Sequence, residues 1–132
     1  MSCEYRQGIR QKRAEIRCMR NYRNLNVWNQ SIELNKMVFS IFNALPKSDV
    51  YELQSQCRRS AISISSNIAE GAGRDSEKDF VRFLHIALGS SFELECQLII
   101  LKNVFGTEHP ELMKELESVQ KQLNGLIKAL TK

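Results

Sequence analysis

Apolar residues recur every three or four positions along one long stretch of the chain. Their spacings of 4, 3, 4, 3, 4, 3 and 4 form a heptad pattern, which places a single apolar stripe along one side of an α-helix. The members of this stripe are Phe80, Leu84, Ala87, Ser91, Leu94, Leu98, Leu101 and Phe105. Because a helix is stabilised mainly by burying its apolar face, this segment requires other helices to pack against it.

Three other segments show the same periodicity, within residues 27–45, 50–68 and 112–130. Their connections are short, at Leu45–Ser48, Gly71–Ser76 and Gly106–His109, and short connections join antiparallel neighbours. The chain has only two prolines and six glycines in 132 residues, as a mainly helical protein would. The sequence therefore predicts an all-α fold: an antiparallel up-down-up-down four-helix bundle at residues 25–132, after a basic N-terminal arm at residues 1–24.

The 80–105 segment carries more apolar surface than one stripe can bury. Outside the stripe it also contains Phe83, Ile86, Phe92 and Ile99. A helix that is apolar over most of its circumference must be buried on more than one side. We expect these four residues to form an interface between copies of the chain. The alternative is that this helix lies centrally within a monomer.

The positive charge is concentrated in the arm. Residues 1–24 hold seven basic and two acidic side chains, whereas the rest of the chain holds 12 basic and 13 acidic ones. If the arm is helical, one face of it is made of arginines, which suit phosphate oxygens: Arg6, Arg10, Arg13, Arg17 and Arg20. Met19 offers an alternative start, so residues 1–18 could equally be an extension without a role. A smaller basic cluster is expected near the 71–76 connection, from Arg58, Arg59, Arg74, Lys78 and Arg82. Both groups are candidate nucleic-acid contacts.

The stretch GAGRDS, Gly71 to Ser76, resembles a phosphate-binding loop only superficially. It lacks a third glycine and a lysine–hydroxyl pair, and a helix precedes it where a strand is required. We interpret it as a corner in which Gly71 ends one helix in the left-handed conformation. Ser76 then caps the next helix, whose first turn contains Glu77 and Asp79.

A polar stripe on the second helix has two readings. It could contact a polar ligand or an RNA backbone, or it could form an interhelical network in which Arg58 or Arg59 pairs with Glu93 or Glu95. The complete predicted network is Arg58, Arg59, Asn67, Glu70, Glu93 and Glu95. A buried charged pair of this kind would fix which helix faces which.

Catalysis is not indicated. The two histidines, His85 and His109, lie on different segments, and no Glu-x-x-His pair of the di-iron type occurs. The four cysteines form no C-x-x-C, so no metal and no cofactor is expected. No apolar run approaches the roughly 20 residues of a membrane span, and the basic N-terminus lacks the apolar core of a signal peptide. A cytoplasmic protein without membrane contact is expected.

The segments VWNQSIEL and LQSQCRRSAISISSNIAEGAGRDSEKDFVRFLHIALGSSFELECQL closely resemble a known family of four-helix bundles. This family is encoded in the intervening sequences of bacterial 23S ribosomal RNA genes. The resemblance runs from about Asn21 to Lys102, with a looser match through the last helix. Its most specific part is S-x-x-S-N-I-A-E-G-x-G-R-x-S followed by F-x-R-F-L-x-I-A-L-G-S.

The resemblance implies a bundle that assembles as a five-membered ring, associates with nucleic acid, and has no enzymatic activity. RNA is the expected polyanion, on this analogy alone. Related proteins include the accessory protein of diversity-generating retroelements, a bundle of the same kind. The alternative hypothesis is therefore a protein-interaction adaptor, with a reverse transcriptase as its partner.

Overall fold

A computed structural model of the chain describes residues 21–43, 45 and 47–131. The predicted arginine face of the N-terminal arm, from Arg6 to Arg20, lies outside the described residues. Within them the chain forms one short 3-10 helix and four α-helices, and no strand. In chain order these elements are η1 (Tyr22–Asn24), α2 (Asn26–Asn43), α3 (Lys47–Ala72), α4 (Glu77–Phe105) and α5 (Pro110–Thr131).

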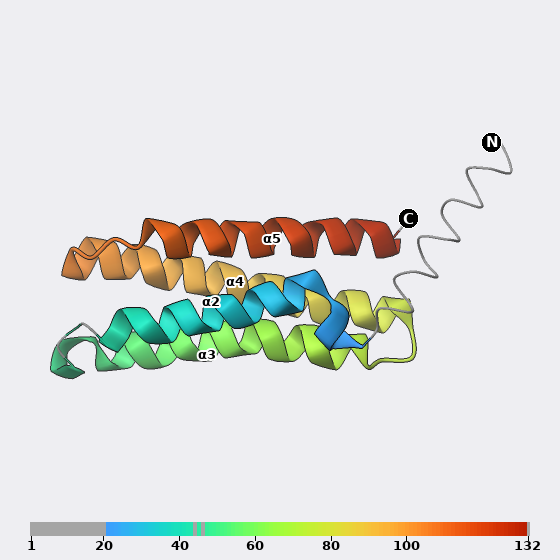
Figure 1. The fold of residues 1–132 in the computed structure, drawn as a ribbon, viewed down its shortest axis with the longest axis horizontal. Coiled ribbons are helices and arrows are strands. Elements are labelled where there is room, and N and C mark those ends of the chain that lie inside the picture. The colour runs from blue at the N-terminus through green and yellow to red at the C-terminus, as the bar shows by residue number, and fades with distance from the viewer. Residues whose placement is uncertain (1–20, 44, 46, 132) are drawn as a thin grey trace, which may run out of the picture.

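The four α-helices lie side by side in one elongated bundle, each running opposite to the helix before it (Figure 1). α2 packs against α3 and α5, and α4 packs against the same two helices. η1 lies against α2 and α3, at the start of the described chain. The all-α up-down bundle predicted from the helical periodicities is confirmed.

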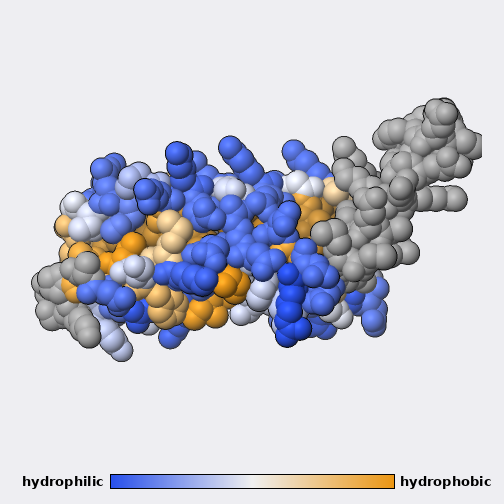
Figure 2. All heavy atoms as spheres, viewed as in Figure 1, coloured by the Kyte–Doolittle hydropathy of each residue, from blue (hydrophilic) through white to orange (hydrophobic). Residues whose placement is uncertain are grey.

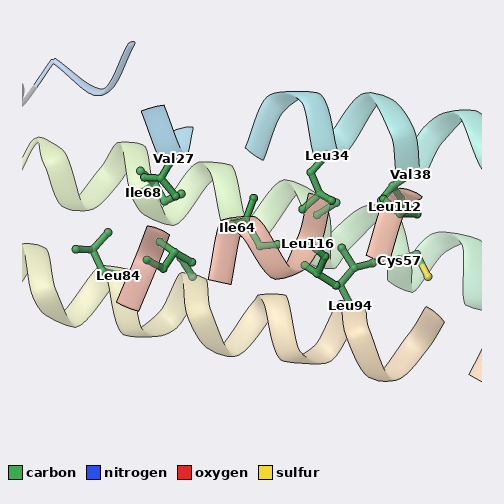
Figure 3. Packing of buried hydrophobic residues seen from close by; sticks show 14 of the residues in the cluster. Val27, Leu34, Val38, Cys57, Ile64, Ile68, Leu84, Leu94, Leu112 and Leu116 are labelled. Carbon is green, nitrogen blue, oxygen red and sulfur yellow. The ribbon is translucent and has the colours of Figure 1, made fainter. Parts of the chain in front are cut away.

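The core is continuous along the bundle and receives side chains from all four helices. Figure 3 shows this packing, with Leu34, Ile64, Leu94 and Leu116 pointing toward one another from four different helices. All four are completely buried. The predicted stripe of α4 is buried from Phe80 to Leu101, and this long contact fixes α4 between α3 and α5.

The helix ends follow local chemistry. Ser76 caps α4, since its hydroxyl accepts a hydrogen bond from the Asp79 backbone N–H at 3.1 Å, as predicted. Pro110 begins α5, where its missing N–H costs nothing. Gly106 ends α4 with φ of 72°, the left-handed conformation that glycine tolerates.

Gly71 does not end a helix, which corrects the sequence interpretation. It lies inside α3 and is absent from the positive-φ residues, of which Gly106 is the single described example. The reason for a glycine here is space. A Cβ added to Gly71 would lie 2.6 Å from the Cβ of Phe83 and 3.1 Å from Cδ1 of Phe80, both on α4. Gly71 is therefore the point at which the backbone of α3 approaches α4 most tightly among the described glycines.

Candidate functional site

The outer side of α4 is an apolar surface. Its exposed members are Ile86, Phe92, Ile99, Ile100 and Val104, with exposed fractions between 43% and 67%. We call these five residues the α4 face. In the same part of the helix, between Ile86 and Leu101, the only charged side chains are Glu93 and Glu95. An apolar surface of this extent on one helix is the kind that associates with another molecule.

The structure separates Phe83 from the other predicted interface residues. Ile86, Phe92 and Ile99 are exposed on the α4 face, but Phe83 is only 6% exposed. Its ring lies beneath two guanidinium groups, with Arg74 Cζ 4.7 Å and Arg82 Cζ 4.5 Å from the ring centroid. Phe83 thus packs within the chain, at the contact between α3 and α4 beside Gly71.

By length and composition, α4 is the one described helix that could cross a membrane. The core helix of a bundle meets the same criteria, and α4 occupies that place here. Its residues Phe80, Leu84 and Leu94 are completely buried against the neighbouring helices. One such helix is weak evidence for a membrane span.

The predicted basic cluster is two groups rather than one. Arg74, Lys78 and Arg82 lie together at the α3–α4 corner, all exposed. Arg58 and Arg59 lie on α3 about 20 Å from its end at Ala72, given 1.5 Å per helical residue.

The corner group carries acidic partners within the same turns. Arg74 donates to Glu70 at 2.8 Å, and Arg82 donates to Asp79 at 3.2 Å. All four of these side chains are well exposed, so each pair stabilises the fold little. The net positive charge of the corner is smaller than the count of its basic residues.

The predicted interhelical ion pairs are not among the contacts of the described residues. Arg58 lies over the ring of Phe39 on α2, 4.6 Å from its centroid, and Arg59 is exposed. Glu93 is exposed on α4 and Glu95 half-buried, and neither forms an ion pair with these arginines within the described chain. Arg58 points toward α2, whereas Glu93 and Glu95 belong to the helix on the other side of α3.

Serine and asparagine side chains form the hydrogen bonds between α3 and its neighbouring helices. Ser31 and Ser65 join α2 to α3 through a 2.8 Å hydrogen bond between buried hydroxyls. Asn35 of α2 donates to the Ser65 hydroxyl at 2.8 Å. Ser63 joins α3 to α4 through the hydroxyl of Ser90, also at 2.8 Å.

Of the predicted network residues, Asn67 alone takes part in this arrangement. Its amide donates to the hydroxyl of Ser63 at 3.0 Å. The sequence signal for the actual network was the run of small polar residues in AISISSN, which faces two helices at once.

Two aromatic residues missed in the sequence analysis stand exposed beside Arg58 and Arg59. Phe39 is 39% exposed and Tyr51 is 71% exposed. Both line a cavity of about 480 Å³ between α2 and α3. Polar residues cover much of the face seen in Figure 2. Apolar residues are exposed on it mainly in the half that holds the α2–α3 and α4–α5 connections. The cavity lies in this half of the bundle.

The described part of the chain contains no group of three metal-ligating side chains. Cys57 is buried and burial raises its thiol pKa to about 12, so it stays protonated and inert at neutral pH. Cys96 is exposed on α4. At the α4–α5 connection, Lys102 donates to Glu108 at 2.6 Å, and this hydrogen bond and charge hold the pKa of Glu108 below its usual value.

These features define a class: a four-helix up-down bundle whose longest helix exposes an apolar face and whose polar contacts are structural. The chain belongs to the family of 23S rRNA-intervening sequence proteins, because the model of that family matches residues 23–125. The match begins just before α2 and continues into α5, and it confirms the resemblance found in the sequence. Among curated proteins, none matches this chain.

Proposed function

We propose that this protein is a non-catalytic, oligomeric protein that associates with RNA in the bacterial cytoplasm. The observation that carries the proposal is the combination of the family membership with the α4 face. The description of the family links it to intervening sequences of 23S rRNA, and the exposed apolar residues of α4 supply a surface for assembly. Copies of the chain meet through this face, five to a ring.

RNA is contacted by arginine and lysine side chains. The arm supplies Arg6, Arg10, Arg13, Arg17 and Arg20, and the corner supplies Arg74, Lys78 and Arg82. A ring repeats each of these groups once per copy, so several weak phosphate contacts act together and the overall affinity exceeds that of one copy. Each neutralised phosphate releases counterions, which makes the affinity depend steeply on salt.

The test is a salt titration of RNA binding, measured by fluorescence anisotropy with a labelled structured RNA. The wild-type chain is expected to bind, with log K falling linearly against log salt. A variant with the five arm arginines replaced by alanine is expected to lose up to about 0.9 from this slope per lost phosphate contact. A variant with Lys114, Lys121 and Lys128 of α5 replaced by glutamine serves as a charge control. Wild-type protein that binds no RNA at low salt would contradict the proposal.

The second candidate is an adaptor for a reverse transcriptase. The observation that favours it is again the α4 face, since a partner protein could cover Phe92 and Ile99 as well as another copy could. Gene context separates the two functions. A gene within a 23S ribosomal RNA insert supports RNA association, whereas a neighbouring reverse-transcriptase gene supports the adaptor.

A further inference from the structure

The cavity between α2 and α3 combines aromatic with basic side chains, the two kinds that stack on bases and bind phosphates. It lies beside the C-terminal part of α2 and the first half of α3, near the end of the bundle where α2 leads into α3 (Figure 1). Its volume is about 480 Å³. Aromatic, basic and amide side chains line it together: Phe39, Phe42, Asn43, Tyr51, Gln54, Ser55, Arg58, Arg59 and Ile62.

Two aromatic side chains at this cavity are exposed. Tyr51 is the most exposed of the large apolar and aromatic side chains on the described helices, at 71%, and Phe39 is exposed to 39%. Neither ring forms an aromatic pair with another ring of the described chain. A base stacks on such a ring irrespective of its sequence, because every base has a π-face.

The two arginines at the cavity, Arg58 and Arg59, differ in the contacts that their guanidinium groups make within the chain. Arg58 is held in place, with its guanidinium 4.6 Å from the Phe39 ring centroid. With the Gln54 amide turned to satisfy both groups, its oxygen accepts from the Arg58 guanidinium at 2.6 and 2.9 Å. Arg58 Nε is buried and has no hydrogen-bond partner within the described residues. Arg58 and Phe39 therefore form a positively charged platform at the cavity.

Arg59 is exposed next to this platform and has no acidic partner among the described residues. No acidic side chain is among the described residues that line the cavity. The contrast with the α3–α4 corner is clear, because there Arg74 and Arg82 are each bonded to a carboxylate. An arginine without a carboxylate partner retains its donors for phosphate oxygens.

We propose that this cavity binds an unpaired nucleotide of single-stranded RNA, with the base against Tyr51 and the Arg58–Phe39 platform and the phosphate at Arg59. The inference rests on the proposed association with RNA and specifies which form of RNA is recognised. Bases in a duplex are stacked on one another and cannot offer a face to Tyr51, whereas unpaired bases can. The amides of Asn43 and Gln54 lie beside the site and supply polar groups for the base edge.

The test compares single-stranded RNA with a duplex of the same sequence. The probe is a fluorescein-labelled RNA of 12 nucleotides without self-complementarity, alone or annealed to its complement, and the readout is anisotropy at fixed salt. Tyr51→Leu removes the ring, and Tyr51→Phe is the matched control that keeps it. Tyr51→Leu is expected to weaken single-strand binding about tenfold, while Tyr51→Phe and duplex binding remain unchanged.

A second pair of variants tests the phosphate contact. Arg59→Gln is expected to reduce the slope of log K against log salt by about 0.7, the value for one phosphate of a single strand. Lys121→Gln removes one exposed charge on α5, away from the cavity, and is expected to leave the slope unchanged. Tyr51→Leu is expected to lower the affinity without changing the slope, because stacking involves no counterion release.

Several results would overturn the assignment. One is a Tyr51→Leu variant that binds the single strand as tightly as wild type, or that loses single-strand and duplex binding equally. Another is a Tyr51→Leu variant whose mass in solution differs from that of the wild type, which would make the cavity a contact between copies. Displacement of the RNA by AMP at equal phosphate concentration would assign the site to a free nucleotide instead. A wild-type protein that binds no RNA contradicts the proposed function itself, whereas the variants test only this site.

Discussion

Replacing Gly71 with alanine tests the close approach of α3 to α4. The added Cβ would lie 2.6 Å from Phe83 Cβ, 3.1 Å from Phe80 Cδ1 and 3.3 Å from the Phe80 carbonyl oxygen. The Cβ of Phe83 and the carbonyl are fixed to the backbone of α4, so no side-chain rotation relieves them. The two helices must separate locally by several tenths of an ångström or more.

The magnitude follows from two opposing effects. Overpacking of a well-packed contact costs about 1–3 kcal/mol. Alanine is more favourable than glycine inside a helix by at most about 1 kcal/mol, and by less near the last turn, where Gly71 lies. The expected net loss in the free energy of unfolding is about 1–2 kcal/mol. For a domain of this size that lowers the Tm by roughly 4–8 °C.

The matched control is Gly125→Ala, on α5. Gly125 is exposed, lies inside a helix, and an added Cβ would meet nothing within 4 Å. This variant is expected to gain about 0.5–1 kcal/mol from helix propensity alone. Urea unfolding followed by circular dichroism at 222 nm, at one protein concentration, compares both variants with wild type. A Gly71→Ala variant as stable as Gly125→Ala would refute the packing argument.

Three further outcomes follow. Cys57 has its thiol pKa raised by burial from 9.0 to about 12, so above pH 9 the unfolded thiol ionises while the folded one does not. The free energy of unfolding then decreases by about 1.4 kcal/mol per pH unit. Urea unfolding at pH 8 and pH 10 should show a smaller decrease for Cys57→Ala than for the wild type. Ser76→Ala removes the α4 cap and is expected to cost about 1 kcal/mol in the same assay, while an unchanged midpoint would mean the cap is unimportant. Ile99→Glu places a charge on the α4 face and is expected to lower the mass by light scattering, whereas Asn124→Glu on α5 should not; equal masses would exclude this face.

The periodicity of the sequence was sufficient to predict the architecture, because a buried stripe repeats whatever the detailed packing. The α4 stripe is buried at every position except Phe105, which lies at the helix end and is 37% exposed. In α5 the alternating spacing of 4 and 3 that begins at Leu112 leads to Leu126, but Leu126 is only half-buried and Ile127 takes the core position. A straight helix drifts relative to a seven-residue repeat, so a stripe shifts by one residue after several turns.

The details of the site could not be predicted, because they depend on how the helices face one another. Gly71 and Gly106 both lie near the end of a helical segment, and sequence alone does not distinguish a close approach from a left-handed cap. One interpretation of the polar stripe paired Arg58 or Arg59 with a carboxylate of α4, but Arg58 faces α2 and lies over Phe39. Phe83 was expected outside with Ile86, yet the packing at Gly71 buries it. How each helix is rotated about its axis decides which neighbour Arg58 and Phe83 face. The periodicity of the sequence does not predict this rotation.

The most direct test of this account is the mass of the purified full-length protein in solution, by size-exclusion chromatography with multi-angle light scattering. One chain has a mass of 15.2 kDa. If copies cover the α4 face of one another in a five-membered ring, the expected mass is five times that value, about 76 kDa. A mass of one chain at micromolar concentration would contradict the account, since the α4 face would then stay exposed in the working protein.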